Sequence, residues 1–220
     1  AGIGGLAALE AIGMAAAVID YASAEIGNAS AMMEGGRLSH ANAPARDLGV
    51  APGMACAEAA TLLAAAPMPA GRCPDVSEAR EVLMPEGALC RLVLVDSAGL
   101  VRPEDAGQVV VTGSHGAVFG GDPANALKAD ARLALFNDAG GGIGTGRLAA
   151  LEARGVAAAT VAAASARIGE ARSTLEDGVI SACNGGARAL GAAPAIAARR
   201  LVARALGLGR GAPLPLGPRG

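Results

Sequence analysis

The second half of the chain alternates short apolar runs with segments of helical character. Residues 89–96 (LCRLVLVD) and 108–112 (QVVVT) are apolar runs with β-branched side chains, which is typical of buried strands. Strands that alternate with helices predict an α/β fold: a Rossmann-like, mostly parallel sheet with flanking helices. The other expected elements are strands over 133–136 and 156–164 and helices over 124–129, 147–154, 175–190 and 194–206.

The first half contains the later part of the same pattern. It predicts a helix over 6–12, a strand over 14–21 and helices over 32–48 and 52–65. A segment rich in proline and glycine follows, which is typical of a linker.

These two halves also match residue by residue at an offset of 142 positions. From Gly4 to Ala55, 28 of the 52 positions are identical to the residue 142 further on. The matches include glycines and polar residues, such as Asn42 over Asn184, so alanine content alone does not explain them. We therefore expect an internal duplication whose first copy is incomplete at its N-terminal side. A fragment of a longer protein is the favoured explanation, and a first copy that was naturally shortened is the alternative. The expected domains are the C-terminal part of the first repeat (1–66), a linker (67–87), the second repeat (88–206) and a flexible tail (207–220).

The composition excludes several classes of protein. With 52% hydrophobic and 17% charged residues, the chain is not expected to be disordered. The chain has a net charge of -2, two phenylalanines, one tyrosine and no tryptophan. It therefore lacks the basic surface and the aromatic stacking platforms expected of a nucleic-acid binder. No apolar run reaches the roughly 18 residues of a bilayer span, so no membrane association is expected.

Two further features concern the compartment, and a third concerns the genome. No basic region precedes an apolar stretch at the N-terminus, so a signal peptide is not expected. The four cysteines lack CxxC spacing, which favours reduced thiols and a cytoplasmic location. The excess of arginine over lysine is typical of a GC-rich genome and is not taken as a sign of function.

Three polar loops are expected to follow strands of the second repeat and to meet at one edge of the sheet. The first loop is Thr112–Gly116, in which Ser114 and His115 lie between glycines. His115 is a candidate acid or base and Ser114 a candidate catalytic hydroxyl, although adjacent residues point apart and do not suit a nucleophile–base pair. A tight turn with a solvated histidine is the alternative.

The second loop begins with Asn137 and Asp138 and continues through the glycines of residues 140–146. Backbone amides of Gly141 and Gly142 at the start of a helix would suit an anion, and Asn137 would contact the same substrate. The run matches neither the P-loop nor the dinucleotide fingerprint, and a plain flexible connection is the alternative. Asp138 is a candidate general base, metal ligand or helix cap.

The third loop, residues 165–178, is the densest polar stretch of the chain. Arg167 and Arg172 would clamp a carboxylate or a phosphate. Ser173 and Glu176 are further candidates for substrate binding, and they also fit a helix-capping box. A solvated face that has drifted between the repeats is the alternative.

These loops support three hypotheses of function, and no cofactor is assigned. The first is a small-molecule enzyme that acts on an anionic or carbonyl-containing metabolite by hydrolysis or proton transfer, as a hydrolase, isomerase or lyase. The second is a non-catalytic protein that binds a nucleotide or an organic acid. The third is a pseudosymmetric assembly module, such as a homo-oligomer, whose alanine-rich helices pack against a partner. Two histidines do not suggest zinc; a Mg²⁺ or Mn²⁺ ion on Asp96, Asp138 or Glu176 is a less favoured alternative.

Overall fold

The computed structural model describes residues 3–25, 28–69, 71–72, 78–118, 122–140, 144–209, 214 and 216. The chain divides into two compact units, Ala1–Ser77 (unit 1) and Glu78–Gly220 (unit 2), and each is described by itself. None of the helices in the described ranges has the length and apolar character needed to cross a bilayer.

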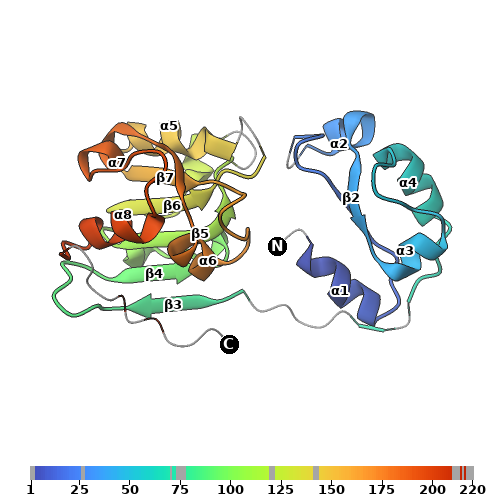
Figure 1. Cartoon of the computed structure of the whole chain (residues 1–220), viewed down its shortest axis with the longest axis horizontal. Helices are drawn as coiled ribbons and strands as arrows, with labels where there is room; N and C mark the ends of the chain where they lie inside the picture. The colour runs from blue at the N-terminus through green and yellow to red at the C-terminus, as the bar shows by residue number, and fades with distance from the viewer. Residues whose placement is uncertain are drawn as a thin grey trace. The chain divides into compact units, whose positions relative to one another are not determined.

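Unit 2 is built on one six-stranded sheet. Its strands are β3 (Arg80–Leu83), β4 (Leu92–Val95), β5 (Val109–His115), β6 (Leu133–Asn137), β7 (Ala157–Val161) and β8 (Ile180–Cys183). They lie side by side in chain order (Figure 1). The four inner strands are parallel, whereas β3 and β8 are antiparallel to their neighbours. The expected mixed α/β fold with a mostly parallel sheet is therefore confirmed.

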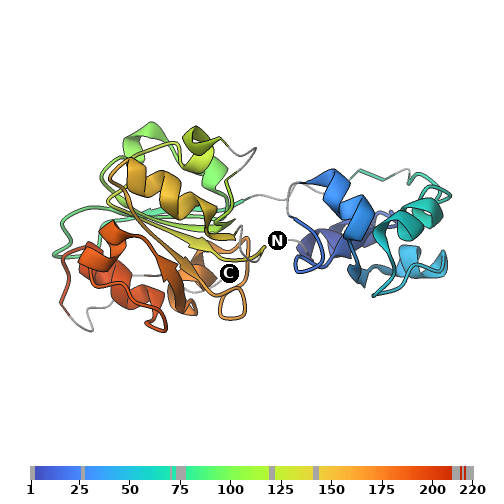
Figure 2. The same cartoon turned by 90° about the horizontal axis from the view of Figure 1, so that it is seen from above.

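Apolar side chains cover both faces of this sheet. All four residues of β4 are buried. Because alternate residues of a strand point to opposite faces, Leu92 and Leu94 join one core cluster and Val93 and Val95 join the other. Figure 2 shows helices above and below the strands of unit 2. The first cluster includes residues of α6 (Ala171–Glu176), α7 (Gly185–Ala189) and α8 (Ala198–Ala205); the second includes residues of η1 (Ala98–Leu100), η4 (Pro123–Ala126) and α5 (Gly146–Ala153).

The three parallel connections of unit 2 pass over the same face of the sheet. The connection from β4 to β5 includes η1 and η2 (Pro103–Asp105), that from β5 to β6 includes η4, and that from β6 to β7 includes α5. Crossovers of one hand on one face place successive strands side by side in one direction. The order of the described strands therefore does not reverse, and the carboxyl ends of β4 to β7 form one continuous edge.

The helix predicted over residues 175–190 is wrong. In the structure α6 ends at Glu176, β8 follows, and α7 begins only at Gly185. Gly178 is packed so tightly that a Cβ atom would lie 2.2 Å from the carbonyl oxygen of Thr174. Pairing with β7 gives Ile180–Cys183 an extended conformation, so the tertiary structure overrides a local pattern that suits a helix.

Two loop assignments also differ from the structure. Gly113, Ser114 and His115 belong to β5, which continues past a register shift between Val111 and His115. Residues 80–83, predicted within the linker, form β3 and pair with β4. Proline and glycine flank this short strand on both sides, so the local composition masked it.

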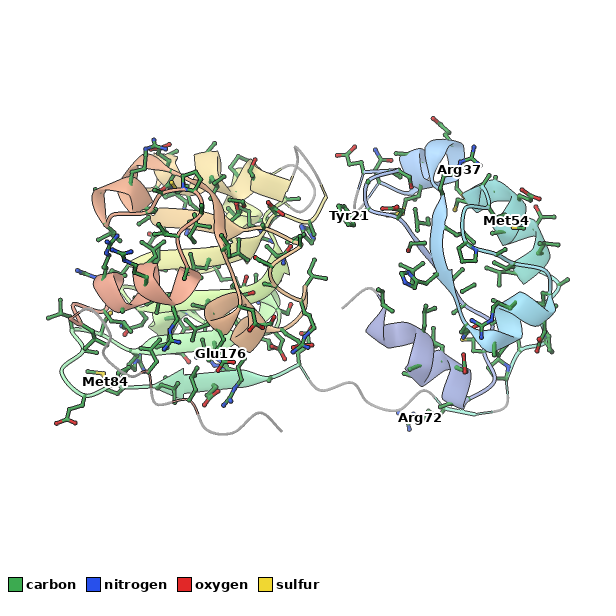
Figure 3. All side chains as sticks on the ribbon, viewed as in Figure 1. Tyr21, Arg37, Met54, Arg72, Met84 and Glu176 are labelled. Carbon is green, nitrogen blue, oxygen red and sulfur yellow. The ribbon has the colours of Figure 1, made fainter. Side chains whose placement is uncertain are left out.

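Unit 1 has six described elements around a small core. They are α1 (Gly4–Ala11), β1 (Ala17–Ile19), α2 (Ala29–Gly35), β2 (Leu38–Ala41), α3 (Ala43–Asp47) and α4 (Cys56–Leu63). β1 and β2 form an antiparallel pair, so the helix predicted over 32–48 is wrong for the same reason as its counterpart in unit 2. Tyr21, which follows β1, is 52% exposed (Figure 3). The buried core consists of Leu38, Ala41, Ala45, Val50 and Ala59.

The elements of unit 1 recur in unit 2 at the offset of 142. The bounds of α1, β2, α3 and α4 each differ by 142 from those of α5, β8, α7 and α8. Asn42 and Asn184 hold matching positions and make matching hydrogen bonds. The side-chain oxygen of Asn42 accepts from the amides of Ala16 and Ala45, and its nitrogen donates to Met14 and Leu6; the partners of Asn184 are Ala158, Ala187, Val156 and Leu148.

Candidate functional site

The three polar segments selected from the sequence lie against one another at the carboxyl edge of the unit 2 sheet. The amide of Gly169 donates to the carbonyl of Gly113 at 2.6 Å. The amide of Gly116 donates to the carbonyl of Asn137 at 2.7 Å, and the side chain of Asn137 donates to the carbonyl of Ala166. Hydrogen bonds therefore connect the segment after β7 to the ends of β5 and β6, through the backbone of Gly113 and the side chain of Asn137.

Two glycines make this close approach possible. A Cβ atom on Gly113 would lie 2.4 Å from the amide nitrogen of Glu170. A Cβ atom on Gly116 would lie 2.1 Å from the carbonyl oxygen of Gly144. Any other residue at either position would push the neighbouring segments apart.

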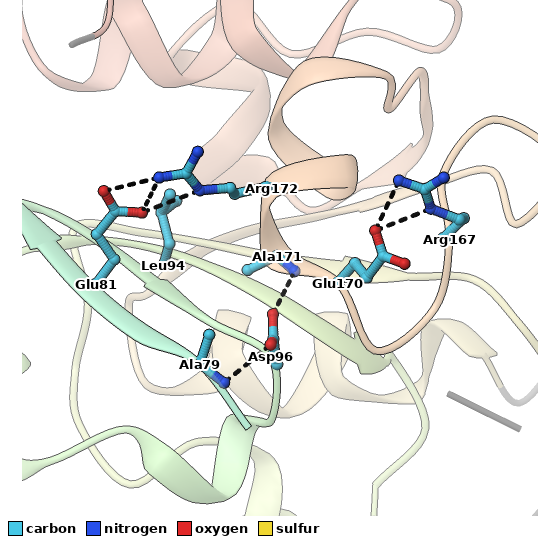
Figure 4. A pocket seen from close by; sticks show the side chains of 8 residues that line it. All are labelled: Ala79, Glu81, Leu94, Asp96, Arg167, Glu170, Ala171 and Arg172. Carbon is cyan, nitrogen blue, oxygen red and sulfur yellow. Dashed lines mark hydrogen bonds and ion pairs between the residues drawn. The ribbon is translucent and has the colours of Figure 1, made fainter. Parts of the chain in front are cut away.

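A cavity of about 390 Å³ opens at this edge, beside β3 and the start of α6. This volume is within the range of small-molecule sites. Figure 4 shows an ion pair toward each side and Asp96 between them. The carboxylate of Asp96 accepts from the amides of Ala79 and Ala171, and so joins β3 to the first turn of α6. The lining residues are Ala79, Glu81, Leu94, Asp96, Arg167, Glu170, Ala171 and Arg172.

The two arginines of this cavity have different surroundings. Arg172 binds Glu81 through two nitrogens, at 2.8 and 3.1 Å to one oxygen, and the two side chains are 28% and 30% exposed. Arg167 pairs with Glu170 at 2.8 Å, but these side chains are 62% and 49% exposed. Water screens an exposed pair and leaves it little net stability. Arg172 thus holds the edge strand to α6, whereas Arg167 can exchange its partner at low cost.

His115 and Ser114 do not line the cavity. The hydroxyl oxygen of Ser114 accepts from the amide of Ala98, and Nδ1 of His115 accepts from the amide of Ala117. Both side chains thus accept from backbone amides of neighbouring segments, which does not fit a nucleophile–base pair between them. Burial, and then the charge of Arg147, lower the pKa of His115, so the imidazole is neutral near pH 7.

Several other predicted site residues have structural partners. The side-chain oxygen of Asn137 accepts from Ala139, and a carboxylate oxygen of Asp138 accepts from Ala163. Ser173 donates to Asp177 and accepts from the amide of Arg167. The N-cap of α6 is Glu170, whose side chain makes no cap bond, so the capping box predicted with Ser173 is wrong. Glu176 lies at the end of α6, outside the cavity lining. Gly141 and Gly142 lie outside the described residues.

Sequence reasoning missed Glu81 and Arg147. Glu81 lies on β3, within the predicted linker. Arg147 is 7% exposed in the first turn of α5, where it donates to the carbonyls of Ala117 and Ala126 and lies over the ring of Phe136. Burial lowers the pKa of Arg147. The sequence signal that could have identified Arg147 is its position directly after the glycine-rich residues 140–146.

The described residues contain no group of three histidine, cysteine, aspartate or glutamate side chains that could hold a metal ion. Asp96, Asp138 and Glu176 therefore do not come together in one such group. The fold and the cavity define a mixed α/β protein with a small polar site at the carboxyl edge of a mostly parallel sheet. Comparison with models of known families, with curated proteins and with solved structures found no match.

Proposed function

We propose that unit 2 binds a small organic anion in the cavity between β3 and α6. The observation that carries this proposal is the placement of Arg167 and Arg172 on one cavity of about 390 Å³. A guanidinium group presents two parallel N–H donors to a carboxylate or phosphate, so an arginine is suited to either. The acidic residues on the same cavity also suit a positive group, which favours a ligand that carries both charges.

Arg167 is the residue that contacts the anion. Its partner Glu170 comes from the same turn and is exposed, so an incoming carboxylate can replace it without disturbing the sheet. Arg172 and Glu81 instead connect α6 to β3 and set the width of the cavity.

Calorimetric titration of the whole protein with aspartate, succinate and inorganic phosphate tests this assignment. We expect at least one of them to bind, and R167A to weaken that binding by about tenfold or more because a charge-assisted pair is lost. R199A removes an exposed arginine of α8, outside the cavity, and serves as the matched control. Equal affinities of R167A and R199A would exclude Arg167 as the anion contact.

The second candidate function is hydrolysis or proton transfer with His115 as the base; because His115 does not line the cavity, its substrate would bind outside that cavity. The observation that favours it is the lowered pKa of His115, because a neutral imidazole can accept a proton. Asp138 and Ser114 would assist from the ends of β6 and β5. H115N should bind aspartate or succinate as the unmodified protein does and should abolish any turnover; a variant that retains full turnover would exclude the role.

We also propose that unit 1 and the C-terminal part of unit 2 are two copies of one repeat, and that the anion site belongs to unit 2 alone. The offset of 142 in the element bounds and the matching bonds of Asn42 and Asn184 support this proposal. The residue 142 positions before Arg167 is Glu25, and the residue 142 positions before Arg172 is Ser30. Unit 1 therefore has neither arginine at the matching position.

A further inference from the structure

β1 of unit 1 and β7 of unit 2 correspond at the offset of 142, but their edges differ. β7 pairs with β8 on one side and with β6 on the other. β1 pairs with β2 alone, and no other strand of the described residues joins that sheet. The second edge of β1 is therefore open where the equivalent edge of β7 is paired with a parallel strand.

The residues around this edge are also less buried in unit 1 than their counterparts in unit 2. All five residues of β7 are buried, whereas the three residues of β1 are only partly buried. Leu175 of α6 is fully buried, but Met33, its counterpart in α2, is 47% exposed. α1 has no buried residue, whereas α5 buries Leu148 and Leu151. In unit 2 the cover comes from β4, β5 and β6, which share their core clusters with these helices.

We infer that the open edge of β1 is a docking site for a parallel, apolar strand equivalent to β6, and this inference rests on the proposed repeat. The order of elements in unit 2 indicates the source. β6 precedes α5 in the chain, so the equivalent strand precedes α1. The occupant is a polypeptide segment of the same kind as residues 78–140, joined on the N-terminal side of α1.

The backbone of β1 is suited to this pairing. In unit 2 the carbonyl of Val161 accepts from the amide of Asp138 on the β6 side. Ile19 holds the matching position in β1, and the N–H and C=O of one strand residue point to the same side. Both groups of Ile19 therefore face the open edge. Ala17, Val18 and Ile19 carry no charge, so nothing in β1 opposes a second apolar strand.

An extended chain tests the inference. A second copy of residues 78–142 is joined directly ahead of Ala1, which reproduces the offset of 142. Hydrogen exchange is followed by NMR at the amides of Ala17 and Ile19, in the 220-residue chain and in the extended chain. We expect exchange to slow by about tenfold or more on extension, because a paired edge amide exchanges only when the strand opens. The control is the same extension with L135P in the added copy only, which breaks the added strand.

Each outcome either supports or overturns the inference that β1 docks a parallel strand. Protection by the intact extension, but not by the extension with L135P, supports the inference. Equal exchange in both extended chains overturns it. A 220-residue chain that is already dimeric by light scattering, with Ile19 protected, shows that a second copy occupies the edge and also overturns it. N42A keeps the two proposals apart, because the repeat requires it to destabilise unit 1 whether or not the chain is extended.

Discussion

Unit 1 and the C-terminal part of unit 2 share one arrangement of hydrogen bonds but differ in the apolar surface they bury. Asn42 and Asn184 are each 3% exposed and each bind four backbone groups. Leu151 of α5 is fully buried, whereas its counterpart Leu9 is only partly buried. The hydrogen bonds of each asparagine thus lie within matching elements of its own unit, whereas the amount of buried apolar surface differs between the units.

This difference has a physical reason. Each asparagine bonds to backbone groups that lie within about 40 residues of one another in the chain. Either unit can therefore form these hydrogen bonds without further strands. An apolar helix face gains stability only when a second layer covers it. Unit 2 supplies that layer with β4 to β7, and unit 1 has one antiparallel pair.

The largest expected effect is the difference in free energy of unfolding between variants of the two leucines, Leu151 and Leu9. L151A should lower the free energy of unfolding of unit 2 by about 3 kcal/mol, because a fully buried leucine leaves a cavity. L9A should cost unit 1 about 1 kcal/mol or less, because water already reaches this side chain. Urea unfolding followed by hydrogen exchange and mass spectrometry separates the units, and the fluorescence of Tyr21, the one tyrosine, reports unit 1. Equal losses in the two variants would show that unit 1 is covered as well as unit 2.

A smaller and more equal effect is expected at the two asparagines. N184A and N42A should each cost their own unit roughly 2 kcal/mol, because buried backbone groups lose their partners. N28A removes an exposed helix cap of α2 and should cost less, so it is the matched control. If N42A has no more effect than N28A, the matching hydrogen bonds do not stabilise unit 1, and the proposed repeat loses its main structural support.

Much of the sheet could be predicted from the sequence because its inner strands are buried on both faces. β4 and β6 consist of buried residues and appear as continuous apolar runs. β8 and β2 could not be found in this way, because their conformation comes from pairing with β7 and β1. Their sequences, ISAC and LSHA, carry little preference of their own.

The residues of the candidate site could likewise be predicted only in part. Arg167 and Arg172 stood out as charges in a chain with few of them, and the structure places both on one cavity. Glu81 could not be found, because only the antiparallel pairing of β3 brings it opposite Arg172. The partners of Ser173 and Asn137 are backbone or local groups, and sequence alone cannot distinguish such bonds from substrate binding.

The smallest predicted effect is a dependence of the stability of unit 2 on pH. Burial raises the pKa of Asp105, but hydrogen bonds from Arg80 and from the amide of Arg102, together with the charges of Arg80 and Arg91, outweigh it and lower that pKa overall. A lowered carboxyl pKa stabilises the fold above the unfolded value of about 3.9, and this contribution is lost as pH falls through the folded value. The pKa of His115 is lowered as well, so its neutral form is favoured in the fold, and stability falls as pH drops below the unfolded value of about 6.5.

Acid should therefore destabilise unit 2 in two separate steps, which thermal unfolding at a series of pH values can measure. H115Q should remove the first step, just below about pH 6.5, and leave the second in place. D105N should remove the second step and also lower stability at neutral pH, because it weakens a pair in which the carboxylate is fully buried. D130N changes an exposed carboxylate that pairs with Arg154 and should leave both steps unchanged, since water screens that pair. If the first step persists in H115Q, a different group titrates there, and the neutral imidazole required for proton transfer loses its experimental support.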